Sequence, residues 1–261
     1  ASVLASFASG MVGSYVVTRR IVFISGSIAH SVLGFMGMFL FLERVYAFSW
    51  ATPLLGAILG AIFSAVLIGW LSLRFSERSD ALIASVWSTG MAVGVIFLSF
   101  TPGYNTEMLN FLFGNLLWTT TEDLLLLLLL DSALFLFISA FYSRFLLICF
   151  DENQAKLKGV NIDFWYIFLL VLISLSIVLL IQMMGIVLVI TLLSLPAMIA
   201  SLFTKRLHRL MALSSLVAFL CSIGGITMAH FCNLPIGASI AVIAAISYLI
   251  SAWVQKPALQ N

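Results

Sequence analysis

Charged residues are scarce in this chain, and their scarcity excludes a soluble globular fold. Only 8% of the 261 residues are Asp, Glu, Lys or Arg, whereas 63% are hydrophobic, and the mean hydropathy is +1.20. A soluble domain typically carries about 25% charged residues. So much apolar surface cannot be buried in one globule, and lipid must therefore surround it. The net charge of +2 and the lack of a basic block exclude nucleic acid as a partner.

Cysteines and catalytic motifs are also few. Cys149, Cys221 and Cys232 are isolated and odd in number, which excludes a disulfide framework and a C-x-x-C metal site. The chain has no G-x-x-x-x-G-K-[ST] phosphate loop, so it cannot hydrolyse ATP by itself. It also lacks H-E-x-x-H, G-x-S-x-G and paired membrane aspartates. Ser27 and His30 are a catalytic pair only in a loose sense, so an intramembrane protease or other membrane enzyme is a remote alternative.

Long hydrophobic runs, in contrast, fill the chain. A helix needs about 20 apolar residues to cross the hydrocarbon core of a bilayer, and these runs are too long and too uniformly apolar for barrel strands. The runs cover approximately residues 1–18, 21–42, 51–73, 81–101, 122–148, 164–184, 186–203, 210–230 and 235–254. The sequence therefore predicts an all-α integral membrane protein. We expect a bundle of eight to nine transmembrane helices, eight if Gly185 does not divide 164–203 cleanly.

The basic residues predict the orientation of this bundle. All of the twelve except Arg44 follow an odd-numbered run. They are Arg19, Arg20, Arg74, Arg78, Arg144, Lys156, Lys158, Lys205, Arg206, Arg209 and Lys256. Because basic residues accumulate on the cytoplasmic side, we expect the N-terminus outside and the C-terminus in the cytoplasm. His208 belongs to the same cytoplasmic turn as Lys205. The chain begins inside an apolar run, so we expect a few N-terminal residues, including the initiator Met, to be missing.

Two G-x-x-x-G pairs predict close helix packing. Gly56 and Gly60 lie in the third run, and Gly90 and Gly94 lie in the fourth. Glycines four residues apart lie on one face of a helix and allow two backbones to approach closely. The alternative is a chance spacing in a membrane chain that contains 17 glycines.

The longest polar connection is "FDENQAKLKGVNIDF", residues 150–164. It predicts a short helix that lies across the membrane surface and ends at Gly159, because glycine is a common helix stop. One interpretation is an ordinary surface loop. The other is a helix on which a cytoplasmic partner docks.

Four segments in this chain resemble, in the same order, the permeases of bacterial ABC transporters that take up zinc, manganese or iron. They are "LFGNLLWTTTEDLLLL" (112–127), "DENQAKLKGV" (151–160), "GIVLVITLLSLPAMIASL" (185–202) and "CNLPIGASIAVI" (232–243). The second has the acidic start and the A-x-x-x-G-V pattern of the family's coupling segment. No single segment is decisive, but together they extend the resemblance over nearly the whole chain.

The resemblance implies a permease subunit in a bacterial cytoplasmic (inner) membrane, formed by residues 1–261 as a single transmembrane domain. It implies a second permease copy or paralogue, cytoplasmic ATP-binding subunits and an extracytoplasmic metal-binding protein, in addition to membrane lipid. The coupling segment, about 150–163, would contact the ATPase through Asp151, Glu152, Ala155, Lys156 and Gly159. The chain would hold no permanent cofactor and would not be an enzyme. An extracytoplasmic protein would dock on residues 43–50 and 102–121, and the mechanism would be alternating access.

The resemblance also predicts a metal path. The family has an Asp and a His four residues apart, which lie on one helix face and offer an oxygen and a nitrogen ligand to a divalent metal. Here His30 is present, but Gly26 replaces the Asp. Ser27 and Ser31 flank the histidine and could orient it or bind the metal weakly, but neither replaces a carboxylate. The alternative is that His30 is a polar residue that the helix tolerates.

Two further residues are candidates for the metal path. Asp131 interrupts an apolar run, and a charged Asp at the centre of a membrane helix costs about 2.5–3.5 kcal/mol. We hypothesise that Asp131 supplies the missing carboxylate, and the alternative is a protonated Asp hydrogen-bonded to a neighbouring helix. His230, beside Cys232, is a weaker candidate at the extracellular entrance, or simply an interfacial residue.

The choice among zinc, manganese and iron stays open, as does a homodimeric or heterodimeric permease pair. A permease for an iron chelate or cobalamin is the main alternative function, because that fold is similar and needs no intramembrane ligand. A secondary transporter is a further possibility, although no inverted repeat marks it.

Overall fold

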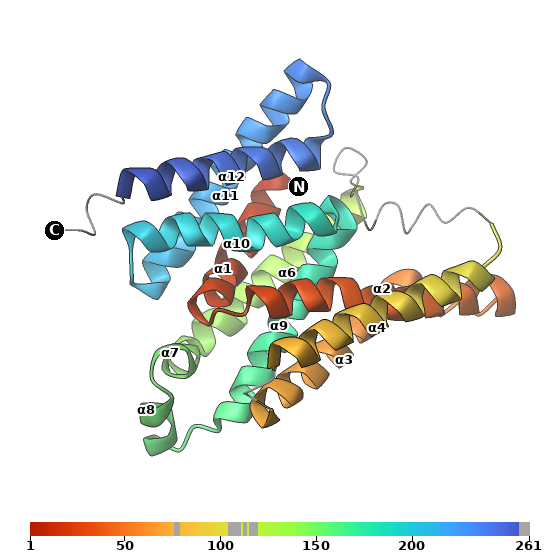
Figure 1. Cartoon of the computed structure of the whole chain (residues 1–261), viewed down its shortest axis with the longest axis horizontal. Helices are drawn as coiled ribbons and strands as arrows, with labels where there is room; N and C mark the ends of the chain where they lie inside the picture. Colours follow the sequence, from red (N-terminus) through yellow and green to blue (C-terminus); the bar gives the residue numbers. More distant parts are fainter. Residues whose placement is uncertain (76–78, 104–110, 112–113, 115–119, 256–261) are drawn as a thin grey trace. The chain divides into compact units, whose positions relative to one another are not determined.

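The computed structural model describes residues 1–75, 79–103, 111, 114 and 120–255, and within these ranges it contains helices and no strand. The helices are α1 (Ser2–Thr18), α2 (Val22–Tyr46), α3 (Pro53–Arg74), α4 (Ser79–Phe100), α6 (Thr121–Ala140), α7 (Tyr142–Phe150), α8 (Glu152–Leu157), α9 (Ile162–Met184), α10 (Ile186–Phe203), α11 (Leu207–Cys232) and α12 (Ile236–Gln255) (Figure 1). The all-helical prediction is confirmed.

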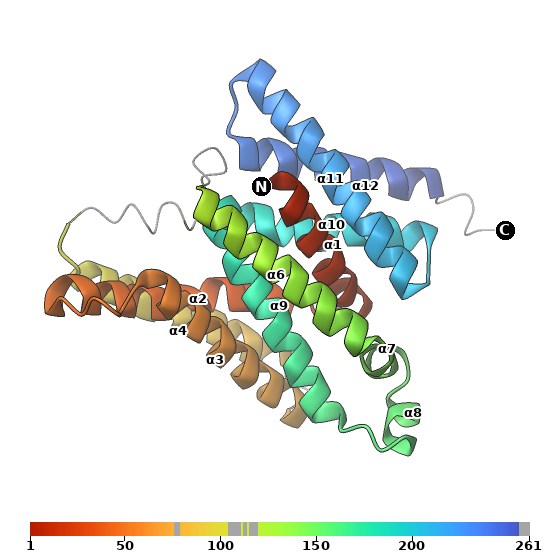
Figure 2. The same cartoon turned by 180° about the vertical axis from the view of Figure 1, so that it is seen from behind.

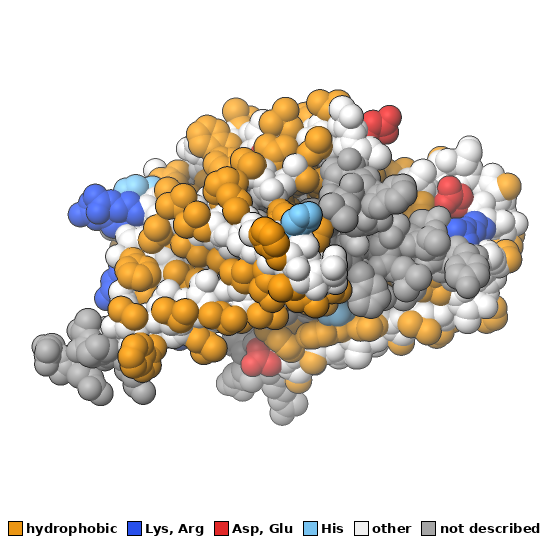
Figure 3. All heavy atoms as spheres, turned by 90° about the horizontal axis from the view of Figure 1, so that it is seen from above, with side chains coloured by type: hydrophobic (Ala, Val, Ile, Leu, Met, Phe, Trp, Pro, Cys, Tyr) orange, Lys and Arg blue, Asp and Glu red, His pale blue; other side chains and the backbone are white. Residues whose placement is uncertain are grey.

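Eight of the described helices are long and apolar enough to cross a membrane: α2, α3, α4, α6, α9, α10, α11 and α12. α1 is apolar too, but it has only 17 residues. Hydrophobic side chains cover much of the face drawn in Figure 3. The expected count of eight to nine spans is therefore confirmed, and the chain is a multi-pass membrane protein.

Local signals in the sequence explain several helix ends. The Thr52 side chain caps α3 by accepting a hydrogen bond from the Leu55 N–H at 3.3 Å, and Pro53 occupies the first turn of that helix. Gly185 separates α9 from α10 with a φ of +78°, a conformation that side chains rarely adopt. The division of 164–203 into two helices is thus real. The run 122–148, in contrast, is not one helix, because the chain turns at Phe141 between α6 and α7.

The chain forms two compact units, which we describe separately. The first unit contains residues 1–22, 110–140 and 179–261. Within it, α1 packs most extensively on α11, and α10 packs on α12 (Figure 2). The α1–α11 contact includes a serine pair, Ser6 and Ser222, whose Oγ atoms lie 3.5 Å apart. The Phe7 and Phe135 rings link α1 to α6.

The second unit contains residues 23–109 and 141–178. Glycines bring α2 and α4 into backbone contact, and both views show these two helices side by side (Figures 1 and 2). A Cβ at Gly34 would lie 2.8 Å from the Gly90 carbonyl oxygen, and one at Gly94 would lie 2.7 Å from the Leu33 carbonyl oxygen. Gly56 meets α2 just as closely through Phe39. Both G-x-x-x-G pairs therefore contribute to close packing, as predicted.

Candidate functional site

His30 lies on α2 and is held by an aromatic neighbour on α4. Its ring stacks on Trp87, with centroids 4.5 Å apart and planes inclined by 11°. The Trp87 indole N–H in turn donates a hydrogen bond to the Met91 Sδ at 3.2 Å. The His30 ring is half-buried, and its Nδ1 is buried without a hydrogen-bond partner in the described part of the chain. Leaving such a buried nitrogen unpaired costs about 1–3 kcal/mol, so His30 presents a nitrogen that a ligand could satisfy.

The two serines beside His30 have other roles. Ser27 donates a hydrogen bond to the Ile83 carbonyl oxygen at 2.9 Å, which ties α2 to α4. Ser31 donates to the Ser64 Oγ at 2.8 Å, which ties α2 to α3. Both hydroxyls are therefore used between helices, and neither donates a hydrogen bond to the buried His30 Nδ1 in the described part of the chain. Gly26, at the position of the family's Asp, is buried.

A cavity of about 230 Å³ opens among α2, α3 and α4. Ser31, the residue that follows His30 in the sequence, is part of its lining. The lining is mostly apolar and includes the hydroxyls of Ser31, Ser64 and Thr89. None of the described residues that line the cavity is acidic, and the polar side-chain atoms that they offer are neutral hydroxyl oxygens and the Met38 sulfur.

Asp131 is buried on α6, with 4% of its surface exposed. Neither carboxyl oxygen has a hydrogen-bond partner among the residues that the structure describes. The hydrogen bond that a structural role would require is therefore missing there. Asp131 belongs to the first unit and His30 to the second. Their pairing stays a prediction.

His230 and Cys232 are exposed at the C-terminal end of α11. The His230 ring packs edge-on against Phe231, with centroids 5.6 Å apart. The helix ends at Asn233, which adopts a left-handed conformation with a φ of +52°. In the described ranges, no group of three His, Cys, Asp or Glu side chains could hold a metal ion. Within either unit, the described candidate ligands therefore do not form a site of three or more such side chains.

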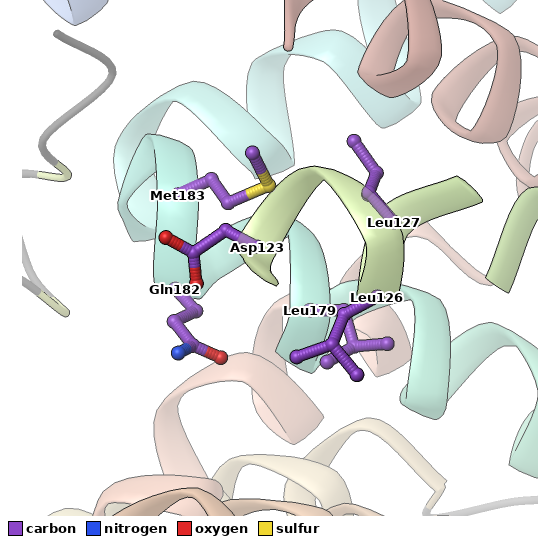
Figure 4. Close-up of a pocket in the computed structure, with 6 residues that line it drawn as sticks. All are labelled: Asp123, Leu126, Leu127, Leu179, Gln182 and Met183. Carbon is purple, nitrogen blue, oxygen red and sulfur yellow. The ribbon is translucent and has the colours of Figure 1, made fainter. Parts of the chain in front are cut away.

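Asp123 has a structural role that the sequence analysis did not assign. Its carboxylate accepts hydrogen bonds from the Thr120 N–H at 3.0 Å and the Thr120 hydroxyl at 2.8 Å, and the Asp123 N–H lies 3.2 Å from the Thr120 Oγ. This is a capping box at the start of α6. With Gln182 and Met183 of α9, Asp123 borders a cavity of only about 10 Å³ (Figure 4). The spacing of Thr and Asp before an apolar run was the available signal.

The polar connection forms the predicted short helix, α8. The Asp151 carboxylate caps it by accepting a hydrogen bond from the Gln154 N–H at 2.8 Å, and Ala155 is fully buried. Gly159 ends the turn with a φ of +68°, and the Val160 N–H donates to the Ala155 carbonyl oxygen at 3.0 Å. Glu152 and Lys156 are exposed, and 88% of the Leu157 surface is exposed. Polar and apolar groups therefore both face outward from this helix.

Known proteins resemble the chain over almost its whole length. A "Probable metal transport system membrane protein" of Chlamydia pneumoniae is 43% identical over 252 residues, which are 97% of this chain and 86% of that protein. The "Manganese transport system membrane protein MntC" of Listeria monocytogenes is 29% identical over 256 residues, 96% of this chain and 86% of that one.

A solved structure also has the same fold. In PsaBC from Streptococcus pneumoniae, in complex with Fab, one chain is 26% identical and superposes with a TM-score of 0.84, covering 100% of this chain and 92% of that one. A model of the ABC 3 transport family matches residues 1–255. The resemblance seen in the four sequence segments is confirmed, and the chain belongs to the ABC 3 transport family.

Proposed function

We propose that the chain is the permease subunit of an ABC importer that moves a divalent transition metal across a bacterial cytoplasmic membrane. The observation that carries the proposal is the full-length similarity to membrane proteins of metal transport systems. Manganese is the first metal to test, because two relatives that are 29% identical over 256 residues are named manganese transport system membrane proteins. Zinc and iron are the other two candidates.

His30 supplies the nitrogen ligand on this path. Its ring is fixed against Trp87, and its Nδ1 is buried and unpaired in the described part of the structure. A neutral imidazole suits zinc and iron, and an imidazole combined with a carboxylate oxygen suits manganese as well. A chelate would need no such ligand, because its metal is already coordinated, so the His30 geometry favours a free metal ion over an iron chelate or cobalamin.

Asp131 supplies a carboxylate from the first unit. A buried acid without a hydrogen-bond partner is costly in an apolar helix, and a transient cation offsets that cost. His230 is a weaker candidate, at the outer end of α11. Transport assays of single variants at Asp131 and His230 test these two assignments.

The energy for transport comes from cytoplasmic ATP-binding subunits, and α8 is the contact through which they act. Its cap at Asp151 and its stop at Gly159 keep it a defined helix, and Glu152 and Lys156 lie on its exposed surface. The assembly includes a second permease copy or paralogue and an extracytoplasmic metal-binding protein. Residues 43–50 and 102–121 are the proposed docking loops, although most of 104–119 lies outside the described residues. The N-terminus is outside and the C-terminus is cytoplasmic.

A transport assay tests this function. The chain is reconstituted in proteoliposomes with its ATP-binding and metal-delivering partners, and uptake of Mn²⁺, Zn²⁺, Fe²⁺ and a ferric chelate is measured with ATP. We expect ATP-dependent uptake of a free ion, reduced at least about tenfold by His30→Ala, as for other groups that tune a metal site.

His208→Ala is the matched control, because that histidine lies in the first turn of α11 and outside the proposed path, and it should transport normally. Uptake of the chelate alone would contradict the metal-ion assignment. In the same vesicles, Gly159→Val should uncouple ATP hydrolysis from uptake, because a β-branched residue cannot easily adopt the φ of +68°. Retained coupling would count against α8 as the ATPase contact.

A further inference from the structure

Arg144 is held on an aromatic platform between α7 and α9. Its guanidinium carbon lies 4.7 Å from the centroid of the Trp165 ring and 5.4 Å from that of Phe141. Both distances are within the range of cation–π attraction. The Arg144 side chain is exposed, whereas only 8% of the Trp165 surface is exposed. We call Arg144, Phe141 and Trp165 the Arg144 platform.

The platform is rigid because its tryptophan is packed on several sides. Trp165 lies 4.9 Å from Phe141, 5.7 Å from Phe145 and 5.7 Å from Phe168, measured between ring centroids. Phe145 is fully buried. An arginine that is already positioned loses less rotational freedom when it binds a ligand. The charge of Arg144 is therefore preorganised.

Within the described part of the chain, no acidic group neutralises the charge of Arg144. Among the residues that the structure describes, no carboxylate forms an ion pair with Arg144 and no acceptor receives a hydrogen bond from its guanidinium. Contacts with aromatic rings leave the five N–H donors of the guanidinium available. Their planar fork fits two oxygens of a phosphate group.

The sequence places Arg144 at the border of the apolar region. No charged residue lies between Asp131 and Arg144, and none follows Asp163 through Met184. Arg144 is thus the first charged residue after the apolar α6, and the apolar sequence of α9 begins beside Trp165, although apolar residues also follow Arg144 up to Phe150. Tyr142 and Trp165 lie at the same border, and tyrosine and tryptophan are enriched at the level of lipid headgroups. A phosphate at this depth belongs to a lipid.

We propose that the Arg144 platform binds the phosphate of an anionic phospholipid headgroup. The guanidinium supplies the charge and the hydrogen-bond donors, and the aromatic rings hold it at headgroup depth. A zwitterionic lipid carries a compensating cation, so it gains less from a single fixed arginine. The site requires neither the metal nor ATP, and the proposal is therefore independent of the transport function.

Native mass spectrometry of the detergent-solubilised transporter tests this site. Phosphatidylglycerol and phosphatidylcholine are titrated separately, and the bound lipid is counted for each variant. We expect selective binding of phosphatidylglycerol, weakened about fivefold by Arg144→Gln, as expected for one basic residue at a membrane surface. Arg144→Lys keeps the charge without the planar fork, so it should bind with intermediate affinity.

Lys158→Gln is the matched control, because Lys158 is exposed and lies outside the platform. It should retain the lipid. Equal weakening in Lys158→Gln and Arg144→Gln would show diffuse attraction and overturn the proposal, as would equal binding of the two lipids. Displacement of the lipid by millimolar inorganic phosphate would identify a free-phosphate site instead and would also overturn it. Arg144→Lys keeps the test valid if Arg144→Gln fails to fold.

Discussion

His30 and Asp131 are both polar groups in apolar helices, but their neighbours hold them differently. His30 stacks face to face on Trp87, and Trp87 is itself hydrogen-bonded to Met91. Asp131 is more deeply buried, and its two oxygens have no hydrogen-bond partner in the ranges that the structure covers. The direction of the His30 ring is thus fixed before any ligand arrives, whereas no hydrogen bond within the described residues orients the Asp131 carboxylate. The difference indicates that His30 is a nitrogen ligand with a preformed orientation. The orientation of the Asp131 carboxylate, in contrast, depends on the group that approaches it.

The largest effect should come from separating the helices that hold His30. Gly90→Ala places a Cβ 2.7 Å from the Ser31 Cβ, and α2 and α4 must move apart. We expect a loss of about 1–3 kcal/mol in the free energy of unfolding, together with loss of uptake. Thermal unfolding in detergent and vesicle uptake measure the two effects.

Gly224→Ala provides the control, since its Cβ would meet the Ile243 Cδ1 at an ordinary 3.4 Å. It should be neutral or slightly stabilising, because alanine favours helices. Equal loss of stability in both variants would mean that the close contact between α2 and α4 is no more sensitive to an added Cβ than the surroundings of Gly224.

The next effect should have opposite signs for stability and transport. Asp131→Leu removes an unpaired polar group from an apolar site, so we expect the free energy of unfolding to rise by about 1–3 kcal/mol while uptake falls. Asp131→Asn keeps a polar group and should leave stability close to that of the parent protein. Both are measured by thermal unfolding and by uptake of the metal. Normal uptake in Asp131→Asn would exclude the carboxylate as a ligand.

The smallest effect should come from replacing Trp87, on which His30 stacks, with a smaller aromatic residue. Trp87→Phe keeps an aromatic face but loses the N–H that binds the Met91 sulfur. An aromatic pair contributes about 0.5–1.5 kcal/mol, so we expect only a few-fold decrease in uptake at low metal concentration. Trp87→Ala removes the stack entirely and should have a larger effect than Trp87→Phe. Equal rates in all three proteins would show that Trp87 does not position His30.

Most of the fold follows from the sequence, because hydrophobic length is a strong signal in a membrane protein. The break at Gly185 and the short helix that ends before Gly159 were both predicted from single glycines, and both have positive φ angles. The turn at Phe141 was not predicted. Apolar residues continue on both sides of it, and neither proline nor glycine marks the break between α6 and α7.

The candidate site was only partly predictable. His30 was identified by a family pattern, but the stack on Trp87 joins residues 57 positions apart on different helices, and no local pattern indicates such a contact. Ser27 and Ser31 were placed beside His30 by sequence proximity, yet they bind Ile83 and Ser64. Their position in the sequence does not reveal the acceptors that neighbouring helices provide.

Gly185 also has a consequence for how the chain enters the membrane. α9 and α10, with 23 and 18 residues, would form a single rod about 60 Å long if they were continuous, twice the hydrocarbon thickness of about 30 Å. Such a rod could not be accommodated upright, and its excess length would leave apolar surface in water. A single residue without a side chain therefore converts one segment too long for any bilayer into two segments that each match its thickness.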